Sequence, residues 1–538
     1  MQTAAATSLD RAEWQRIVFA ERPRRADLLT LPAAGGEPLR INVHRNRPFE
    51  PVAACASPFL RYAGWDASFV FSDYDDSLSF SGWRPADVEL IWLDFARYRP
   101  FDRSWLEGRI RWLRNATAAP ILVPAPVDGD LAVSMAGVRI CPQGPIQGAL
   151  GSRYLDSRTG VDLSGEACVE TARHLAFVWL PPALRPRIKA IAVDLDNTLY
   201  HGVLGEDGVN GVEMTPAHAE LQRRLVELQE SGALLAIVSK NERADVESLF
   251  DRRRDFPLRR EHFSAVSASW GPKSAGLRAA AAEMRIALEA VLFIDDNPGE
   301  LAEAAAHNPG LHTLHASSPL NTVRALKLYP GLNGYTSGDA DRLRAADLAA
   351  ASRRAREQAA SADPGEYLAS LQIEIGLALD RAEDVHRLHE LSMKTNQFNT
   401  GFLRLSEAQT AERIASEDCP TASIRLRDRL SDSGLVGAIF TRLAGETLHV
   451  EEIALSCRAL GRQIEDVMIR EALAGIAARH PEIREILFSF QAAPRNAPAR
   501  QWLARFTGAE PAPGDAPGVP RIRLESRDRL PVSIVWQT

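Results

Sequence analysis

Four carboxylates follow two apolar segments of the chain, and their spacing makes them the first candidates for chemistry. They are Asp194, Asp196, Asp295 and Asp296. The apolar segments 190–193 and 292–294 that precede them read as buried strands. Doubly wound parallel sheets bind ligands at the carboxyl ends of such strands, so all four acids are expected at one sheet edge. The alternative is that they only cap the helices that follow.

Two further motifs take the same kind of position. Ser239, followed by Lys240 and Asn241, comes directly after an apolar segment, and Lys273 opens a predicted helix. Ser239 could equally cap a helix. Strands are expected at 190–193, 234–238, 264–266 and 290–294, and helices at 216–231, 242–250, 274–285 and 299–307. The alternation of strands and helices predicts a doubly wound parallel sheet.

In this order the motifs resemble the haloacid dehalogenase (HAD) superfamily, whose first motif is Asp-x-Asp-x-Thr. The resemblance implies that Asp194 is a nucleophile that forms an aspartyl-phosphate, with Asp196 as general acid and base. Mg²⁺ is the implied cofactor, because it offsets the charge of a phosphate substrate. The implied metal ligands are Asp194, the main-chain carbonyl of Asp196, and Asp296, with Asp295 in support. The implied phosphate contacts are Ser239, Lys240, Asn241 and Lys273.

The gaps between these motifs are short. About 40 residues separate the first motif from Ser239, and about 30 separate Ser239 from Lys273. Neither gap can hold a sizeable cap domain. A capless, open site is expected, which suits a phosphate carried on something large or a partner domain that acts as a lid.

A closer resemblance lies around these motifs. The segments 199–208 and 293–298 resemble the FkbH-like branch of the HAD superfamily, although Tyr200 and His201 stand where that family usually has Trp-Gly. The resemblance implies transfer of a glyceryl unit from 1,3-bisphosphoglycerate to the phosphopantetheine thiol of an acyl carrier protein, with loss of phosphate, in polyketide-type biosynthesis.

The C-terminal region resembles an acetyltransferase (GNAT) fold, in which a turn at a helix start points N–H groups at a pyrophosphate. Gln463 stands in this turn where a small residue is usual. Cys457, next to Arg458, is the candidate to accept the glyceryl group as a thioester; the alternative is a buried core cysteine. His386 and His389 are expected to be surface or packing residues. The implied acyl and pantetheine contacts are Lys394, Asn396, Gln397, Asn399, Arg458, Gly461, Arg462 and Asn496.

The whole chain is therefore expected to be an α/β multidomain protein. Residues 1–183 form apolar runs separated by helical patterns and loosely resemble an SGNH-hydrolase-like domain, without a serine in the nucleophile position. We expect this domain to be non-catalytic. A HAD-like domain is expected at 184–330, a helical linker at 331–365 and a GNAT-like α+β domain at 366–538.

Composition and charge argue against several other classes of protein. A net charge of −7 over 538 residues argues against a general nucleic-acid binder. No apolar run is long enough to span a membrane, the N-terminal residues do not resemble an export signal, and the five scattered cysteines fit a reducing cytoplasm. Two alternatives stay open: a plain phosphatase with a degenerate acyl domain, and a non-catalytic adaptor for a carrier protein.

Overall fold

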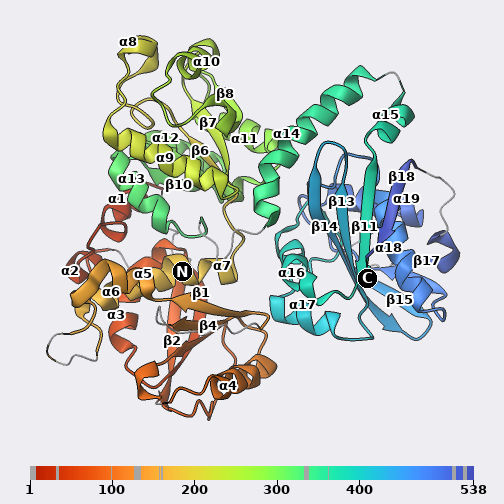
Figure 1. The fold of residues 1–538 in the computed structure, drawn as a ribbon, viewed down its shortest axis with the longest axis horizontal. Helices are drawn as coiled ribbons and strands as arrows, with labels where there is room; N and C mark the ends of the chain where they lie inside the picture. The colour runs from red at the N-terminus through yellow and green to blue at the C-terminus, as the bar shows by residue number, and fades with distance from the viewer. Residues whose placement is uncertain are drawn as a thin grey trace. The chain divides into compact units, whose positions relative to one another are not determined.

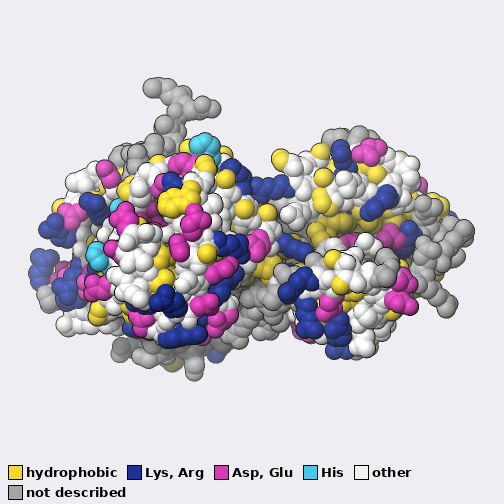
Figure 2. All heavy atoms as spheres, turned by 90° about the horizontal axis from the view of Figure 1, so that it is seen from above, with side chains coloured by type: hydrophobic (Ala, Val, Ile, Leu, Met, Phe, Trp, Pro, Cys, Tyr) yellow, Lys and Arg dark blue, Asp and Glu magenta, His cyan; other side chains and the backbone are white. Residues whose placement is uncertain are grey.

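This computed structural model describes residues 8–31, 35–98, 100–125, 135–156, 158, 162–332, 339–361, 363–511, 517–524 and 530–537. The chain forms two compact units, Met1–Ser337 and Gly338–Thr538 (Figure 1). Within the described ranges, no helix is both long and apolar enough to cross a membrane. Acidic and basic side chains are interspersed over the face drawn in Figure 2.

The first sheet of the first unit has five parallel strands. They are β1 (Glu37–Arg45), β2 (Trp65–Tyr74), β3 (Val88–Trp92), β4 (Ile121–Ala125) and β5 (Val138–Pro142), in the order β2-β1-β3-β4-β5. The helices are α3 (Glu50–Tyr62), α4 (Arg103–Ala116), α5 (Gly144–Leu150) and α6 (Gly165–His174). This strand order is that of a doubly wound sheet. It confirms the predicted α/β layers, while the SGNH-like resemblance stays a prediction.

The second sheet is also parallel throughout. Its strands are β6 (Ala190–Val193), β7 (Leu234–Ser239), β8 (Phe263–Ala268), β9 (Val291–Asp295) and β10 (His312–His315), in the order β10-β9-β6-β7-β8. Its helices are α8 (Leu204–Gly211), α9 (Pro216–Glu230), α10 (Arg243–Arg252), α11 (Lys273–Glu283), α12 (Pro298–His307) and α13 (Pro319–Leu328). The predicted doubly wound sheet is confirmed. The sequence had not indicated β10, α8 or α13.

The two sheets of the first unit share one hydrophobic core. Helix α1 (Ser8–Val18) packs against α12 and β10, and Phe19, which follows it, belongs to the same core. The Phe19 ring lies 5.2 Å from Tyr62, 5.3 Å from Phe177 and 6.2 Å from Tyr329. Residues 1–183 and 184–330, predicted as separate domains, are therefore parts of one compact unit.

The second unit contains a mainly antiparallel sheet in which β15 pairs in parallel with β16. Its strands are β11 (Ile373–Leu379), β12 (Phe398–Asn399), β13 (Thr421–Arg427), β14 (Asp432–Ala444), β15 (Thr447–Leu455), β16 (Glu485–Phe488), β17 (Gly518–Pro520) and β18 (Val532–Trp536). Its helices include α15 (Pro364–Ser370), α16 (Val385–Lys394), α17 (Glu407–Ile414), α18 (Glu465–Arg479) and α19 (Ala497–Thr507). The predicted α+β sheet is confirmed.

The helix that the sequence suggested as a linker belongs to the second unit. In α14 (Asp339–Ala360), the Asp347 carboxylate accepts hydrogen bonds from the hydroxyls of Ser431 at 2.8 Å and Ser433 at 2.7 Å. Arg354 forms a buried ion pair with Asp428 at 2.8 Å. The helix predicted within 331–365 is therefore part of the second unit, because its polar side chains are fixed within that unit. Residues 333–338 lie outside the described ranges.

Candidate active site

Three of the four predicted acids meet at the carboxyl edge of the second sheet. Asp194 directly follows β6. Its N–H donates a hydrogen bond to the Ile294 carbonyl at 2.9 Å, which continues the pairing of β6 with β9. Asp295 ends β9, and Asp296 follows it. One carboxylate oxygen from each of Asp194, Asp295 and Asp296 lies within 4.8 Å of the others. Asp194 and Asp295 are buried and Asp296 is half-buried, so the group is largely shielded from water.

Lys273 is the cation within this group. It begins α11, and its ammonium lies 3.1 Å from Asp194 Oδ1 and 2.6 Å from Asp295 Oδ2. Burial lowers the pKa of Lys273, but the charges of Asp194 and Asp295 outweigh burial and raise it above its ordinary value. When ionised, three carboxylates beside one ammonium leave two negative charges in a shielded site. Such an excess requires a counter-ion.

The carboxylates respond to this crowding in the expected direction. Burial raises the pKa of Asp194, and Lys273 offsets this only in part. Burial, followed by the charge of Asp194, raises the pKa of Asp295 to about 7. The same two causes raise the pKa of Asp296. A divalent cation would remove the repulsion that these acids share.

Asp295 and Asp296 differ in what already binds them. Lys273 occupies Asp295 Oδ2, and the N–H of Asn297 donates to Oδ1 at 2.9 Å. In contrast, the Asp296 carboxylate is hydrogen-bonded only by its own backbone N–H among the described residues, and Asp194 Oδ1 has the Lys273 ammonium at 3.1 Å as its cationic neighbour. Open carboxylate oxygens are what a hard cation such as Mg²⁺ binds. Asp194 and Asp296 thus fit the ligand positions, and Asp295 fits the supporting one.

The Asp196 side chain points elsewhere. Its Oδ1 accepts hydrogen bonds from the Tyr200 hydroxyl at 2.7 Å and from the N–H of Leu204 at 2.9 Å. Its Oδ2 accepts one from the Asn241 amide at 2.9 Å. Asp196 therefore accepts the first N–H of α8, although the N-cap residue of that helix is Val203. Its carboxylate is not one of the three clustered acids, so a metal contact is left to its main-chain carbonyl.

The sequence did not reveal the support that Tyr200 gives to Asp196. Burial raises the pKa of Tyr200 far above its ordinary value, and Asp196 adds to this effect, so the phenol stays protonated and donates. The available signal was spacing, because Tyr200 lies four residues after Asp196. Asn241, for which phosphate binding stays a prediction, donates to Asp196 and to the Ser239 hydroxyl, the latter at 3.0 Å.

Ser239 and Lys240 have different surroundings. Ser239 is buried at the end of β7 and hydrogen-bonds Asp194. It does not cap α10, whose cap position is Glu242. Lys240 was predicted to bind phosphate, but its ammonium pairs with Glu300 in the first turn of α12 at 2.5 Å.

No separate cap domain is inserted between β6 and β7. Residues 194–233, between β6 and β7, form only the helices α8 and α9, as the capless prediction required. Trp270, three residues before Lys273, is 67% exposed, and its indole N–H donates to Glu242 at 2.7 Å.

The predicted acyl residues of the second unit are held mainly by other protein groups. Lys394 pairs with Glu390 at 2.5 Å. Burial opposes ionisation of Glu390, but Lys394 and Arg387 outweigh it and hold its pKa well below the usual range. Asn396 and Gln397 are exposed, with Asn396 accepting from Arg404 at 2.5 Å.

Two further asparagines of this set are buried and act within the fold. Asn399 accepts the N–H groups of Gly401 and Phe402. Asn496 donates to the carbonyl of Asn399 at 3.0 Å. His389 hydrogen-bonds the Leu405 carbonyl at 2.8 Å, which confirms it as a packing residue.

The predicted turn before α18 has formed, with its arginines directed inward. Arg458 pairs with Asp347 at 3.4 Å and Arg462 with Asp428 at 3.0 Å. The N–H of Gly461 donates to Glu465 at 2.8 Å, so a carboxylate occupies one of the donors expected for a pyrophosphate. Cys457, at the start of the turn, is half-buried rather than part of the core.

No protein-family model matches this chain, and no curated protein does. Among solved structures, it is similar to the N-terminal part of a Bacteroides fragilis protein that contains a phosphatase domain complexed with Mg, at 15% identity over 60% of this chain and 99% of that chain, with a TM-score of 0.43. It is similar to a GCN5-related glucosamine N-acetyltransferase region of a fungal β-N-acetylglucosaminidase, at 11% identity over 94% and 67%, with a TM-score of 0.18. It is also similar to Neisseria gonorrhoeae N-acetylglutamate synthase with coenzyme A and L-arginine, at 11% identity over 90% and 91%, with a TM-score of 0.15. With these scores below 0.5, the functional assignment rests on the geometry of the site.

Proposed function

We propose that the first unit is a Mg²⁺-dependent phosphohydrolase of the HAD type that forms an aspartyl-phosphate on Asp194. The observation that carries this proposal is the group of Asp194, Asp295 and Asp296, in which one lysine leaves two negative charges uncompensated. Asp194 and Asp296 would hold the cation, which when bound offsets the charge of the substrate phosphate.

The side chains around the group suit the two halves of this reaction. An Asp194 oxygen attacks phosphorus, the ester P–O bond breaks, and Asp196 gives a proton to the leaving oxygen. Asp196 then takes a proton from water, whose oxygen attacks phosphorus and releases Asp194 and phosphate. Ser239 and Lys273, which both contact Asp194, would stabilise the transferring phosphoryl group.

The test uses p-nitrophenyl phosphate with and without Mg²⁺, together with acid-quenched intact mass measurement. The parent chain should turn over only with Mg²⁺ and carry a phosphoryl adduct, and Asp194→Asn should lose both. Asp66→Asn, which changes an exposed acid of the same unit, is the control. Mg²⁺-dependent turnover that survives in Asp194→Asn contradicts the proposal.

We further propose that the second unit transfers a glyceryl group to a carrier-protein thiol through Cys457. The half-buried position of this thiol, at a turn after β15, favours the proposal over a core cysteine. The thiolate would attack the acyl carbon of 1,3-bisphosphoglycerate, the acyl C–O bond would break, and phosphate would leave. The acyl group would then pass to the pantetheine thiol. The Asp194 site would remove the remaining phosphate ester.

Intact mass measurement with 1,3-bisphosphoglycerate, Mg²⁺ and a holo-acyl carrier protein separates the alternatives. A glyceryl adduct on the carrier that disappears in Cys457→Ala but persists in Cys419→Ala supports transfer, since Cys419 is also half-buried. Phosphate release without an adduct supports a plain phosphatase. If neither an adduct nor free phosphate forms, the result supports a non-catalytic carrier-protein adaptor. The five free cysteines fit the cytoplasm, which we propose as the compartment.

A further inference from the structure

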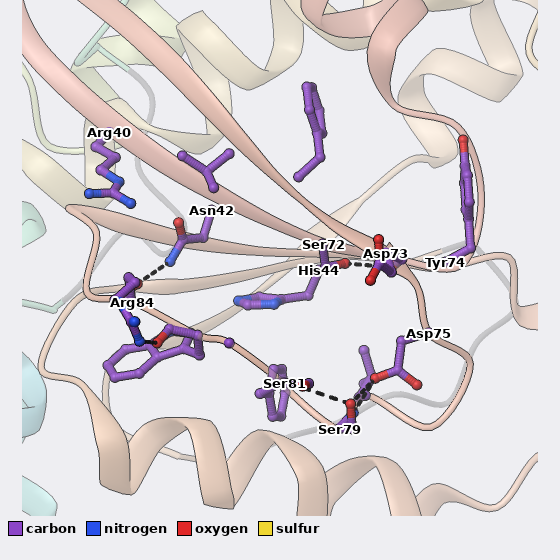
Figure 3. Close-up of a pocket in the computed structure, with 16 residues that line it drawn as sticks. Arg40, Asn42, His44, Ser72, Asp73, Tyr74, Asp75, Ser79, Ser81 and Arg84 are labelled. Carbon is purple, nitrogen blue, oxygen red and sulfur yellow. Dashed lines mark hydrogen bonds between the residues drawn. The ribbon is translucent and has the colours of Figure 1, made fainter.

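A pocket of 340 Å³ lies against the first sheet of the first unit, away from the acids of the second sheet (Figure 3). Strand β1 lines it with Arg40, Asn42 and His44, which alternate along the strand and so share one face. The loop 75–84 lines the other side. Leu39, Ile41 and Val43, at the intervening positions of β1, are buried in the hydrophobic core on the opposite face.

A buried carboxylate organises the polar face of β1. Glu89 of β3 is fully buried and accepts hydrogen bonds from Trp83 Nε1 at 3.0 Å and Asn42 Nδ2 at 3.2 Å. His44 Nε2 lies 2.7 Å from the other Glu89 oxygen. No described residue bonds the second ring nitrogen of His44. Strands of parallel sheets are normally apolar on both faces, so this polar row is not required by the fold.

Hydrogen bonds fix the conformation of the loop over the pocket. Asp75 accepts four hydrogen bonds from the N–H and hydroxyl groups of Ser77 and Ser79. Leu78 and Phe80 have φ angles of 50° and 55°, in the left-handed region that residues with side chains rarely adopt. Arg109 holds this conformation by donating two hydrogen bonds to the Leu78 carbonyl. Strained backbone of this kind clusters at ligand sites.

Charges are separated along the pocket. Figure 3 shows Arg40 and Arg84 at one end, Asp73 and Asp75 at the other, and His44 between them. Asp75 is already saturated by its loop. No carboxylate of the described residues pairs with the side chain of Arg40 or Arg84, and both residues are exposed. The Arg84 Nη1 donates to the Trp83 carbonyl at 3.2 Å, and the remaining donors of the two guanidinium groups are of the kind that binds anions.

We propose that this pocket is a second ligand site, which binds a small organic acid through Arg40 and Arg84 with His44 as a further hydrogen-bond partner. The acidic group is a carboxylate or a phosphate monoester, because both match the planar donors of arginine. Phe71, Phe80 and Trp83 also line the pocket and supply apolar walls for the carbon skeleton. The volume falls within the roughly 300–1,000 Å³ of small-molecule sites.

Isothermal titration calorimetry of the full chain in EDTA, without Mg²⁺, tests this site. The probes are benzoate and phenyl phosphate, with benzyl alcohol as the uncharged control. At least one acid should bind more tightly than the alcohol, and the comparison between the two acids identifies the preferred group. Arg40→Ala and Arg84→Ala should each weaken that binding about tenfold or more.

The matched control is Arg111→Ala, which removes an exposed arginine of α4 outside the pocket and should leave the affinity unchanged. His44→Gln, checked for folding by circular dichroism, should also bind more weakly. The proposal is overturned if neither acid binds better than benzyl alcohol. It is also overturned if both arginine variants retain the parent affinity, because the probe is then bound elsewhere, for example at Asp194.

Discussion

At the scale of single residues, the acids at the edge of the second sheet differ in which of their oxygens are already occupied. Asp295 is held on both oxygens by Lys273 and Asn297, whereas the Asp296 carboxylate is hydrogen-bonded, among the described residues, only by its own backbone N–H. A carboxylate held in this way orients its neighbours, and an open one is free to coordinate. Two consecutive aspartates therefore acquire separate roles.

This difference predicts how Mg²⁺ dependence responds to substitution. Asp296→Asn removes an open ligand, so we expect the Mg²⁺ concentration for half-maximal turnover to rise roughly tenfold or more. Asp295→Asn should mainly lower kcat, because Lys273 loses an ion pair of 2.6 Å. Mg²⁺ titration of p-nitrophenyl phosphate turnover measures both effects. If Asp295→Asn gives the larger rise in Mg²⁺ requirement, Asp295 is the metal ligand and Asp296 the supporting residue.

Tyr200 offers a second prediction at this scale. Tyr200→Phe removes the 2.7 Å hydrogen bond to Asp196 but leaves those from Leu204 and Asn241. Asp196 would lose orientation rather than contact with substrate, so kcat should fall about tenfold while KM stays unchanged. Tyr329→Phe is the control, since this buried tyrosine bonds Thr313 instead. A rise in KM at constant kcat would contradict a positioning role.

The sequence was sufficient to find the acids but not their partners. Asp194 and Asp296 follow apolar strands, and parallel strands end at one edge, so their meeting could be predicted. The ion pair of Lys240 with Glu300 joins side chains 60 positions apart. Such pairs depend on side-chain conformations that no local pattern encodes.

At the scale of elements, the same limit applies to α14. Its composition correctly predicted a helix, but a linker was inferred because the residues that hold it are distant in sequence. Asp347 bonds Ser431 and Ser433 and pairs with Arg458, which lies 111 positions along the chain. This helix thereby turns Arg458 inward, away from the role in ligand binding that the resemblance implied.

The Asp347 network predicts a stability effect. Asp347→Ala removes the carboxylate that pairs with the largely buried side chain of Arg458, and removing one partner of such an ion pair typically destabilises a protein by about 3 kcal/mol. Differential scanning calorimetry of the full chain should show a lower Tm for the second unit and an unchanged Tm for the first. Asp418→Ala removes an exposed acid of the second unit and should change neither. An unaltered second transition in Asp347→Ala would show that the network is weak.

The hydrogen bond at the start of α18 leads to a prediction about the affinity of the second unit for coenzyme A. The Glu465 carboxylate accepts the Gly461 N–H, so a pyrophosphate must displace an anion to reach that donor. Glu465→Ala should bind coenzyme A at least about fivefold more tightly than the parent, by loss of this competition and repulsion. Glu471→Ala, on the same helix, is the matched control. Calorimetric titration measures both, and equal affinities would exclude Glu465 as a barrier.

At the scale of the whole molecule, the sequence separated 1–183 from 184–330 because each contains its own sheet pattern. It could not show that Phe19, Tyr62, Phe177 and Tyr329 form one aromatic cluster across that boundary. Apolar periodicity indicates which residues are buried but not which distant segment they meet. Because the core is continuous, the site of Asp194 and the pocket of Figure 3 belong to one folded unit.

Because the two sheets of the first unit share a core, we expect them to unfold in one cooperative transition. Two histidines, one near each sheet, can test this expectation. His174, in the first sheet's region, and His312, in β10 of the second sheet, are partly buried, and burial lowers the pKa of each to about 4. In an unfolded chain the pKa is about 6.5, so below that pH the unfolded state binds more protons. Each histidine therefore costs the first unit stability as pH falls from about 6.5 to about 4.

The buried acids near Asp194 shift stability in the opposite direction, so variant and parent must be compared at each pH. At pH 7, His174→Gln and His312→Gln should each change the Tm of the first unit only slightly. As the pH falls toward 4, the Tm of each variant should rise relative to the Tm of the parent. Calorimetry should show the gain in a single transition for the whole first unit, whichever histidine is replaced. Two transitions, each responding to only one substitution, would instead mean that the sheets unfold independently and that the common core contributes little to their cooperativity.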